Sequence, residues 1–282
     1  MIRRLPTDCG WIEIADEGSC RCVQGNASHD PVVLLHGFTG DKDIWLELRE
    51  RLAANRRVIS FDLPGHGGTR IGDRIENYSI ESAAAMLVTA LTTTLSIPRF
   101  TLIGYSMGGR LALFIALRYA ASVSRLVIES ASAGISDPGE RARRRADDTA
   151  LAEFIRAKGI VAFVDRWEAM ALFQSLAALP PETLRKLREQ RLTCSPAGLA
   201  CSLLAMGSGS QPWLGGELPQ LRLPVLVMAG ALDRKFADLG GSLSSVIPGS
   251  RLQIIDRAGH LPHLERPARF LRIVTDFLNE AG

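Results

Sequence analysis

A serine between two glycines, at the junction of an apolar run and a helical pattern, limits the possible folds of this chain more than any other segment. Residues 100–103 form the apolar run, Gly104-Tyr-Ser-Met-Gly108 follows, and residues 110–120 have a helical pattern. The order strand, Gly-x-Ser-x-Gly, helix is the nucleophile elbow, a tight turn that lifts a serine hydroxyl above the end of a sheet. Glycine is needed where neighbouring backbone passes close to such a turn. A Gly/Ser turn could carry the same letters by chance, but both flanking patterns favour an elbow with Ser106 facing a pocket.

A second apolar run, residues 32–35, ends at His36-Gly37-Phe38. Four consecutive apolar residues are typical of a strand in a parallel sheet that is covered on both faces. The turn after this strand can aim a main-chain N–H at the serine. We predict that the N–H groups of Phe38 and Met107 form a two-donor oxyanion hole. We interpret the His36 side chain as structural, holding the loop.

Two late segments supply an acid and a base. Residues 224–229 read as a buried strand that leads to Asp233, and residues 251–255 read as a strand that leads to His260. Both side chains follow strands, as a site at the carboxyl ends of a parallel sheet requires. The imidazole of His260 can take the proton of Ser106, and the Asp233 carboxylate can hold the imidazole tautomer. The chain order serine, aspartate, histidine is that of the α/β-hydrolase triad.

Each of these assignments has a competitor nearby in the sequence. His263 lies three residues after His260, and we interpret it as a loop residue or a neighbour of the pocket. Asp238 and Asp256 compete with Asp233, but Asp256 ends the last strand itself and Asp238 lies a turn further on. We rank both below Asp233.

The segments alternate between strand and helix at both ends of the chain, which predicts a mostly parallel sheet flanked by helices. Further expected elements are a hairpin of residues 11–15 and 21–24, strands 57–61 and 125–129, and helices 45–53 and 79–95. From residue 130 to residue 213 the alternation stops, and the expected helices are 139–158, 160–168, 181–191 and 197–205. We therefore predict an α/β core of residues 1–129 and 214–282, and an inserted helical cap of residues 130–213 that closes the pocket.

Composition excludes several classes of function. Hydrophobic residues make up 46% of the 282-residue chain, and the net charge of +3 gives no electrostatic argument for nucleic acid or a membrane surface. The five cysteines show neither an even framework nor a C-x-x-C spacing, so we expect a reducing compartment. With no signal-peptide run and no long apolar span, we predict a cytoplasmic location. No G-x-G-x-x-G opens a helix and no metal spacing occurs, so we predict no cofactor and no metal; no pattern indicates an oligomeric state.

The chain resembles the α/β-hydrolase superfamily along nearly its whole length. Within it, several segments resemble the 2-succinyl-6-hydroxy-2,4-cyclohexadiene-1-carboxylate (SHCHC) synthases of menaquinone biosynthesis. The segments that carry this resemblance are Gly104-Tyr-Ser-Met-Gly-Gly-Arg110, Glu140-Arg141-x-x-Arg144, Phe163-Val-Asp-Arg-Trp167, Phe173, Leu187-Arg188, Gly207-Ser-Gly-Ser-Gln-Pro212, Asp233-Arg-Lys-Phe236 and the Gly259-His-x-x-x-x-Glu265-x-Pro267 ending.

The resemblance implies an activity and a set of site residues. Enzymes of that family eliminate pyruvate from 2-succinyl-5-enolpyruvyl-6-hydroxy-3-cyclohexene-1-carboxylate and use no metal or organic cofactor. The residues implied are Ser106, Asp233 and His260 as the triad, Arg110, Arg144 and Arg188 as carboxylate binders, and Tyr105 and Trp167 as pocket walls. The alignment leaves Arg143 and Arg145 open as substitutes for Arg144.

A substrate with three carboxylates needs several cations, and the planar fork of arginine can bind a carboxylate through two hydrogen bonds. Arg110 lies one helical turn after Ser106 and is therefore expected to face the pocket. The arginines of the predicted cap could instead form a solvated helix face. Two other functional hypotheses remain. One is a carboxylesterase or carbon–carbon bond hydrolase that works through an acyl-enzyme, and the other is a non-catalytic protein that binds a small ligand.

Overall fold

The computed structural model describes residues 1–17 and 29–280. Within these residues the strands form one nine-stranded sheet in the order β1-β2-β4-β3-β6-β7-β8-β9, with β5 paired to β2. The strand bounds are β1 Ile2–Thr7, β2 Gly10–Glu17, β3 Val32–Leu35, β4 Val58–Phe61, β5 Arg70–Ile71, β6 Phe100–Tyr105, β7 Val123–Glu129, β8 Val225–Gly230 and β9 Arg251–Ile255. The six strands from β4 to β9 along this order are parallel, so the predicted mostly parallel sheet is confirmed.

The N-terminal hairpin differs from the prediction. The strand predicted at residues 11–15 exists within β2, but it pairs antiparallel with β1, which the sequence analysis did not predict. The predicted partner, residues 21–24, lies outside the described residues, as do Cys20 and Cys22. In β1 only Leu5 is buried, so its sequence lacks the regular apolar alternation of a strand that covers a core.

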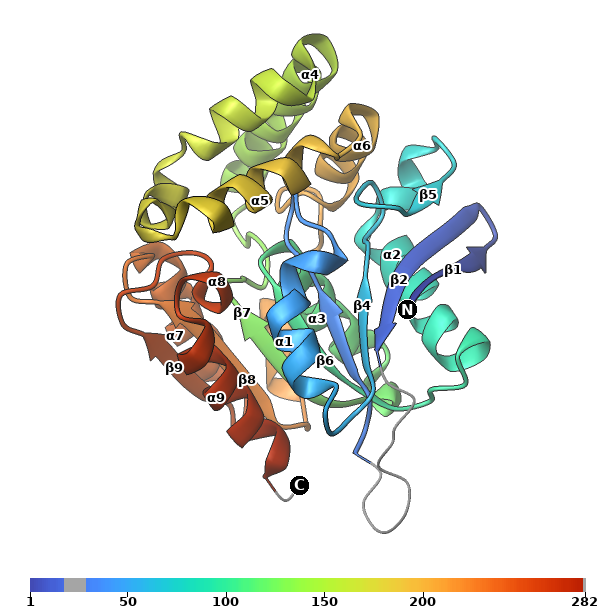
Figure 1. The fold of residues 1–282 in the computed structure, drawn as a ribbon, viewed down its shortest axis with the longest axis vertical. Helices are drawn as coiled ribbons and strands as arrows, with labels where there is room; N and C mark the ends of the chain where they lie inside the picture. The colour runs from blue at the N-terminus through green and yellow to red at the C-terminus, as the bar shows by residue number, and fades with distance from the viewer. Residues whose placement is uncertain (18–28, 281–282) are drawn as a thin grey trace.

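Helices cover both faces of the sheet (Figure 1). The side chains of β3 alternate, with Val33 and Leu35 in one core cluster and Val32 and Leu34 in the other. Helices α2, α3 and α7 pack on the first cluster, and α1 and α9 pack on the second. The helix bounds are α1 Leu46–Leu52, α2 Ile80–Thr89, α3 Met107–Arg118, α7 Arg234–Val246, α8 Pro262–Glu265 and α9 Pro267–Asn279.

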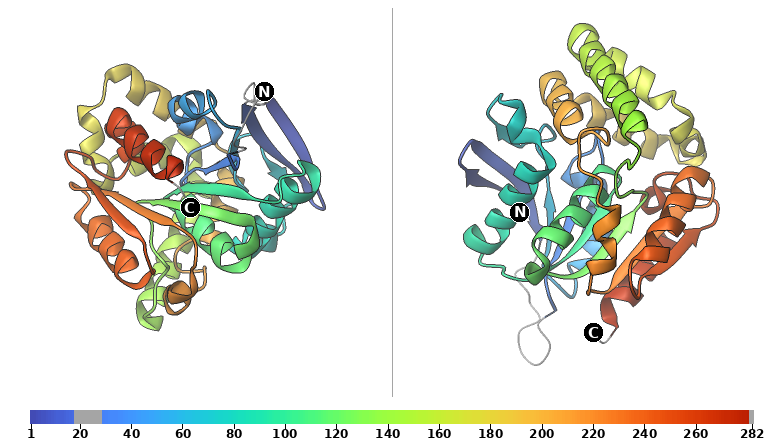
Figure 2. Two further views of the ribbon diagram at one scale, coloured as in Figure 1. Left: turned by 90° about the horizontal axis from the view of Figure 1, so that it is seen from below. Right: turned by 180° about the vertical axis from the view of Figure 1, so that it is seen from behind.

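Between β7 and β8 the chain forms helices α4 (Pro138–Glu168), α5 (Pro181–Leu192) and α6 (Pro196–Met206), which we term the helical insertion. The predicted break between helices 139–158 and 160–168 is confirmed as a kink at Gly159, whose φ of 77° and ψ of 178° are not helical. Figures 1 and 2 show the insertion beyond one end of the sheet. It has a small apolar cluster of its own, which includes Ile155, Phe163 and Leu199. No helix in the described part of the chain is both long enough and apolar enough to cross a membrane.

Candidate active site

The elbow at Ser106 is strained, and its glycines are required by close contacts. Ser106 joins β6 to α3 with a φ of 52° and a ψ of −108°, a backbone conformation that residues other than glycine rarely adopt. A Cβ on Gly104 would lie 2.3 Å from the carbonyl oxygen of Gly108, and one on Gly108 would lie 2.3 Å from that of Leu35. The N–H of Ser106 donates to the carbonyl of Glu129 at 2.8 Å. Neighbouring strands therefore hold the turn that presents the serine.

The three residues proposed as a triad meet in space. The imidazole Nε2 of His260 lies 3.2 Å from Ser106 Oγ, and its Nδ1 lies 2.6 Å from Asp233 Oδ2. Asp233 is the residue before α7, and its other oxygen accepts the N–H of Phe236 at 3.3 Å. His260 is 2% exposed and Asp233 8% exposed, so water is largely excluded from the contact between them. This geometry lets the imidazole take a proton from the serine while the carboxylate stabilises the resulting charge.

The competing residues lie elsewhere. Asp238 and Asp256 are exposed to solvent. His263 is buried, but its Nδ1 lies 2.9 Å from both carboxylate oxygens of Glu129, at the end of β7. The ring of Tyr105 packs against both histidines, with its centroid 5.4 Å from that of His260 and 5.0 Å from that of His263. Burial raises the pKa of Tyr105 well above its usual range, so its hydroxyl stays protonated.

Two main-chain N–H groups at the site have no acceptor among the described residues. They belong to Phe38 and Met107, and both residues line the cavity that contains Ser106. Unpaired amides at the start of a helix and on a neighbouring turn can stabilise negative charge beside a nucleophile. The side chain of His36 is structural, as predicted: its Nε2 accepts the N–H of Leu63 at 3.0 Å. Burial lowers the pKa of His36 to about 4 and keeps the ring neutral.

A cavity of about 1230 Å³ lies between the carboxyl ends of the strands and the helical insertion. Ser106 and His260 line its floor, and Trp167 of α4 lines it from the insertion. The Trp167 ring packs against Phe38 and Phe173, with centroids 5.4 Å away in each case. An apolar wall beside the nucleophile excludes water from the reacting atoms and strengthens charge interactions there.

Arg110 lines this cavity. Its Nη1 donates to the carbonyl of Met206 at 2.9 Å and to the side-chain oxygen of Gln211. Burial, together with the nearby positive charge of Arg144, lowers the pKa of Arg110 to about 10. The side chain is therefore still charged at neutral pH, and neutral oxygens hold it in place. Among residues 1–17 and 29–280 no carboxylate lies at hydrogen-bond distance from this guanidinium, and a cation held in this way is suited to binding an incoming anion.

The arginines of α4 separate into two groups. Arg143 and Arg144 line the cavity and Arg145 does not. Arg144 Nε donates to Asp148 at 2.8 Å, which leaves its two terminal nitrogens without a recorded partner in the described part of the chain. Burial raises the pKa of Asp148. Of the three arginines that the sequence left open at this position, Arg143 and Arg144 thus remain as candidates for binding a substrate carboxylate.

The prediction that Arg188 faces the substrate is wrong. Arg188 does not line the cavity, and its guanidinium forms ion pairs at 2.5 Å with Asp165 and 2.6 Å with Glu168. Arg191, one turn further along α5, lines the cavity and is 4% exposed. Arg191 pairs with Glu168 at 3.0 Å and lies over the ring of Phe173. The sequence signal was its spacing of four from the apolar Leu187, which places it on the inner face of α5.

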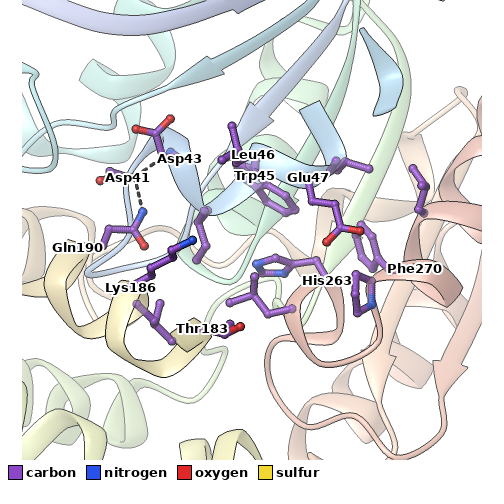
Figure 3. A pocket seen from close by; sticks show the side chains of 16 residues that line it. Asp41, Asp43, Trp45, Leu46, Glu47, Thr183, Lys186, Gln190, His263 and Phe270 are labelled. Atoms are coloured by element: carbon purple, nitrogen blue, oxygen red, sulfur yellow. Dashed lines mark hydrogen bonds between the residues drawn. The ribbon is translucent and has the colours of Figure 1, made fainter. Parts of the chain in front are cut away.

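A second cavity, of about 440 Å³, is lined by residues of α5, of α8 and α9, and of the segment 41–48 (Figure 3). Its inner wall includes Trp45, His263 and Phe270, and the Trp45 and His263 rings lie 4.5 Å apart. Ile44 and Leu187 line both cavities and separate them. Ser106 does not line this second cavity, so the chemistry of the elbow belongs to the larger one.

A family model described as "alpha/beta hydrolase fold" matches residues 30–267. The SHCHC synthase of Serratia proteamaculans (strain 568) is 31% identical over 260 residues, which cover 92% of this chain and 97% of that protein. A Bacillus subtilis (strain 168) protein to which the same activity is provisionally assigned is 40% identical over 265 residues, covering 94% of this chain and 93% of that protein. The solved structure of MenH from S. aureus is similar with a TM-score of 0.87 and 33% identity, over 95% of this chain and 97% of that chain.

Proposed function

The chain belongs to the α/β-hydrolase fold family and, within it, to the SHCHC synthases, and from that premise we propose its reaction. The reaction is the elimination of pyruvate from 2-succinyl-5-enolpyruvyl-6-hydroxy-3-cyclohexene-1-carboxylate, which yields SHCHC. The protein is then a carbon–oxygen lyase built on a hydrolase fold. The observation that carries the proposal is the juxtaposition of an elbow serine, hydrogen-bonded to a histidine–aspartate pair, with cavity-lining arginines.

The proposed mechanism needs no acyl-enzyme. His260 takes the hydroxyl proton of Ser106, and the serine oxygen removes the ring proton of the substrate. The electrons of that C–H bond form a new ring double bond, the existing ring double bond shifts by one position, and the C–O bond to the enolpyruvyl group breaks. The departing enolate takes the proton held by His260 and leaves as pyruvate, which restores the neutral imidazole. The free N–H groups of Phe38 and Met107 are placed to stabilise negative charge that develops next to Ser106.

The substrate carries three carboxylates, and the cations of the cavity suit them. We propose that Arg110, Arg144 and Arg191 bind these groups, with Arg191 taking the place first assigned to Arg188. Arg110 comes from α3, directly beside the elbow, while the other two come from separate helices of the insertion. Cations that converge from three elements can fix the ring over the serine, which places the reacting proton near the base. Tyr105 and Trp167 supply the apolar walls.

The organisation of the chain enters the same proposal. We propose that residues 130–213 act as the cap of this site and that residues 1–129 and 214–282 form its α/β core. The helical insertion contributes much of the cavity lining, which supports this division. We also propose a cytoplasmic location, which fractionation of a cell that expresses the protein would test.

The test is kinetic. The purified protein should release pyruvate from the substrate, and pyruvate can be followed with a coupled lactate dehydrogenase. Ser106→Ala should lower turnover by at least about 1000-fold, because the proton acceptor is lost. A wild-type protein that releases no pyruvate, or a Ser106→Ala variant that retains near-normal turnover, would contradict the proposal. A rapid burst of product from p-nitrophenyl acetate together with inactivity on the proposed substrate would favour the esterase reading instead.

A further inference from the structure

Two buried carboxylates near the catalytic histidine have no part in the mechanism above. One is Glu265, which is 6% exposed and lies at the end of α8. Its Oε2 accepts the N–H of Gly259 at 2.8 Å, and its Oε1 accepts the N–H of Leu261 at 3.1 Å. These two residues directly flank His260, so a single carboxylate holds the peptide groups on both sides of the catalytic imidazole.

In the part of the chain that the structure describes, no cation competes with these two amides for the Glu265 carboxylate. Within residues 1–17 and 29–280, no lysine, arginine or histidine nitrogen lies within 4.0 Å of it. A buried carboxylate must be compensated by hydrogen-bond donors, and the two amides on either side of His260 are the donors recorded here. If the peptide group on either side of His260 rotated, one oxygen of the Glu265 carboxylate would lose its hydrogen-bond donor in a place where water cannot replace it. The position of His260 is therefore coupled to the solvation of a buried charge.

The loop has little room to adopt another conformation. A Cβ on Gly259 would lie 2.0 Å from Ser175 Oγ, and a Cβ on Gly230 would lie 2.1 Å from the carbonyl oxygen of Gly259. Further along, the N–H of His263 donates to Glu129 Oε1 at 2.9 Å. The second buried carboxylate, Glu129, thus holds the far end of the loop, whereas Glu265 holds the part that carries His260.

We propose that Glu265 is a positioning residue for His260, which fixes the imidazole in line between Ser106 and Asp233 by holding both adjacent peptide groups. The spacing of five residues between the histidine and the glutamate allows α8 to turn the carboxylate back beneath the loop. This inference rests on the proposed function only where it gives Glu265 a role in the release of pyruvate. Its geometric content, the orientation of His260 toward Ser106, is independent of the substrate.

The test compares Glu265→Gln and Glu265→Ala with Glu13→Gln as a matched control. Glu13 is likewise a buried carboxylate, bound by Lys42 and Arg4, but it lies on β2, which β4 and β3 separate from β6. Displacement of the imidazole should lower kcat by about 10- to 100-fold in Glu265→Ala, with KM nearly unchanged. Glu265→Gln keeps one acceptor oxygen, so its kcat should lie between those of Glu265→Ala and the wild type. Glu13→Gln should lose stability and keep its kcat.

Two further measurements do not depend on the substrate. The rate at which a fluorophosphonate labels Ser106 requires the serine–histidine geometry, so it should fall in the same order as kcat. The low-field proton resonance of the His260 Nδ1–H should broaden or shift in the Glu265 variants and not in Glu13→Gln. If Glu265→Ala does not fold, Glu265→Gln carries the same comparisons.

The proposal is overturned if the folded Glu265 variants keep kcat and the labelling rate within about twofold of the wild type. It is also overturned if Glu13→Gln, at an equal loss of stability, lowers both rates as much. If the wild type releases no pyruvate, the proposed function fails, while the labelling rates and the resonance still decide the role of Glu265.

Discussion

Replacement of Arg191 by methionine tests which arginine of α5 binds substrate. The guanidinium is buried, pairs with Glu168 at 3.0 Å and lies 5.2 Å from the ring centroid of Phe173. Methionine keeps much of the volume above that ring and removes the charge and the donors. A charge-assisted hydrogen bond to a substrate carboxylate is worth about 1.5–3 kcal/mol. At about 1.4 kcal/mol per tenfold change, kcat/KM should fall by roughly 10- to 150-fold.

Arg188→Met is the matched control. Arg188 pairs with the same Glu168, but it is only half-buried and lies outside the cavity. An ion pair that is open to solvent is worth at most about 1 kcal/mol, which corresponds to about fivefold, so kcat/KM should stay within about fivefold of the wild type. Both variants are assayed by pyruvate release over a range of substrate concentrations, with the loss in Arg191→Met expected mainly as a raised KM. Equal losses in the two variants, or a normal kcat/KM in Arg191→Met, would contradict a role of Arg191 in binding the substrate.

Three further predictions concern stability. Gly159→Ala should destabilise the protein by about 1–3 kcal/mol because Gly159 has a positive φ, although nothing lies within 4 Å of the new methyl group. Gly241→Ala in α7 is the control: its methyl group is equally unobstructed, and the change should be neutral or stabilising by up to about 1 kcal/mol. Urea unfolding of the two variants measures the difference. Gly108→Ala should lower the unfolding free energy by more than about 3 kcal/mol, since its Cβ would lie 2.3 Å from a main-chain oxygen, and a normal urea midpoint would contradict this. Burial lowers the pKa of His36 from 6.5 to about 4, so between these pH values the folded protein binds fewer protons than the unfolded chain. The free energy of unfolding should therefore fall as the pH drops from about 6.5 to about 4. Unfolding curves of His36→Gln should show a smaller dependence of this free energy on pH.

The parallel sheet and the elbow were predictable because their signals are local. Residues 32–35 and 100–103 are short, largely apolar runs, and glycine is required at positions 104 and 108 by contacts with adjacent backbone. The acid and the base could be placed as well, since each directly follows a strand whose carboxyl end meets the others at one edge of the sheet. By contrast, β1 was not predicted because an edge strand with a single buried side chain carries almost no periodic pattern.

Local patterns were enough to predict the layers, the order of the triad candidates and the helix break at Gly159, because hydrophobic period and glycine geometry act over a few residues. Contacts between distant segments, in contrast, place Arg191 rather than Arg188 in the cavity and join Glu265 and Glu129 to the loop of His260. Those outcomes depend on which side of a helix is covered by a distant segment and on which buried charge finds its donors. A side chain's direction relative to residues a hundred positions away is set by packing, and packing is not encoded in any local pattern.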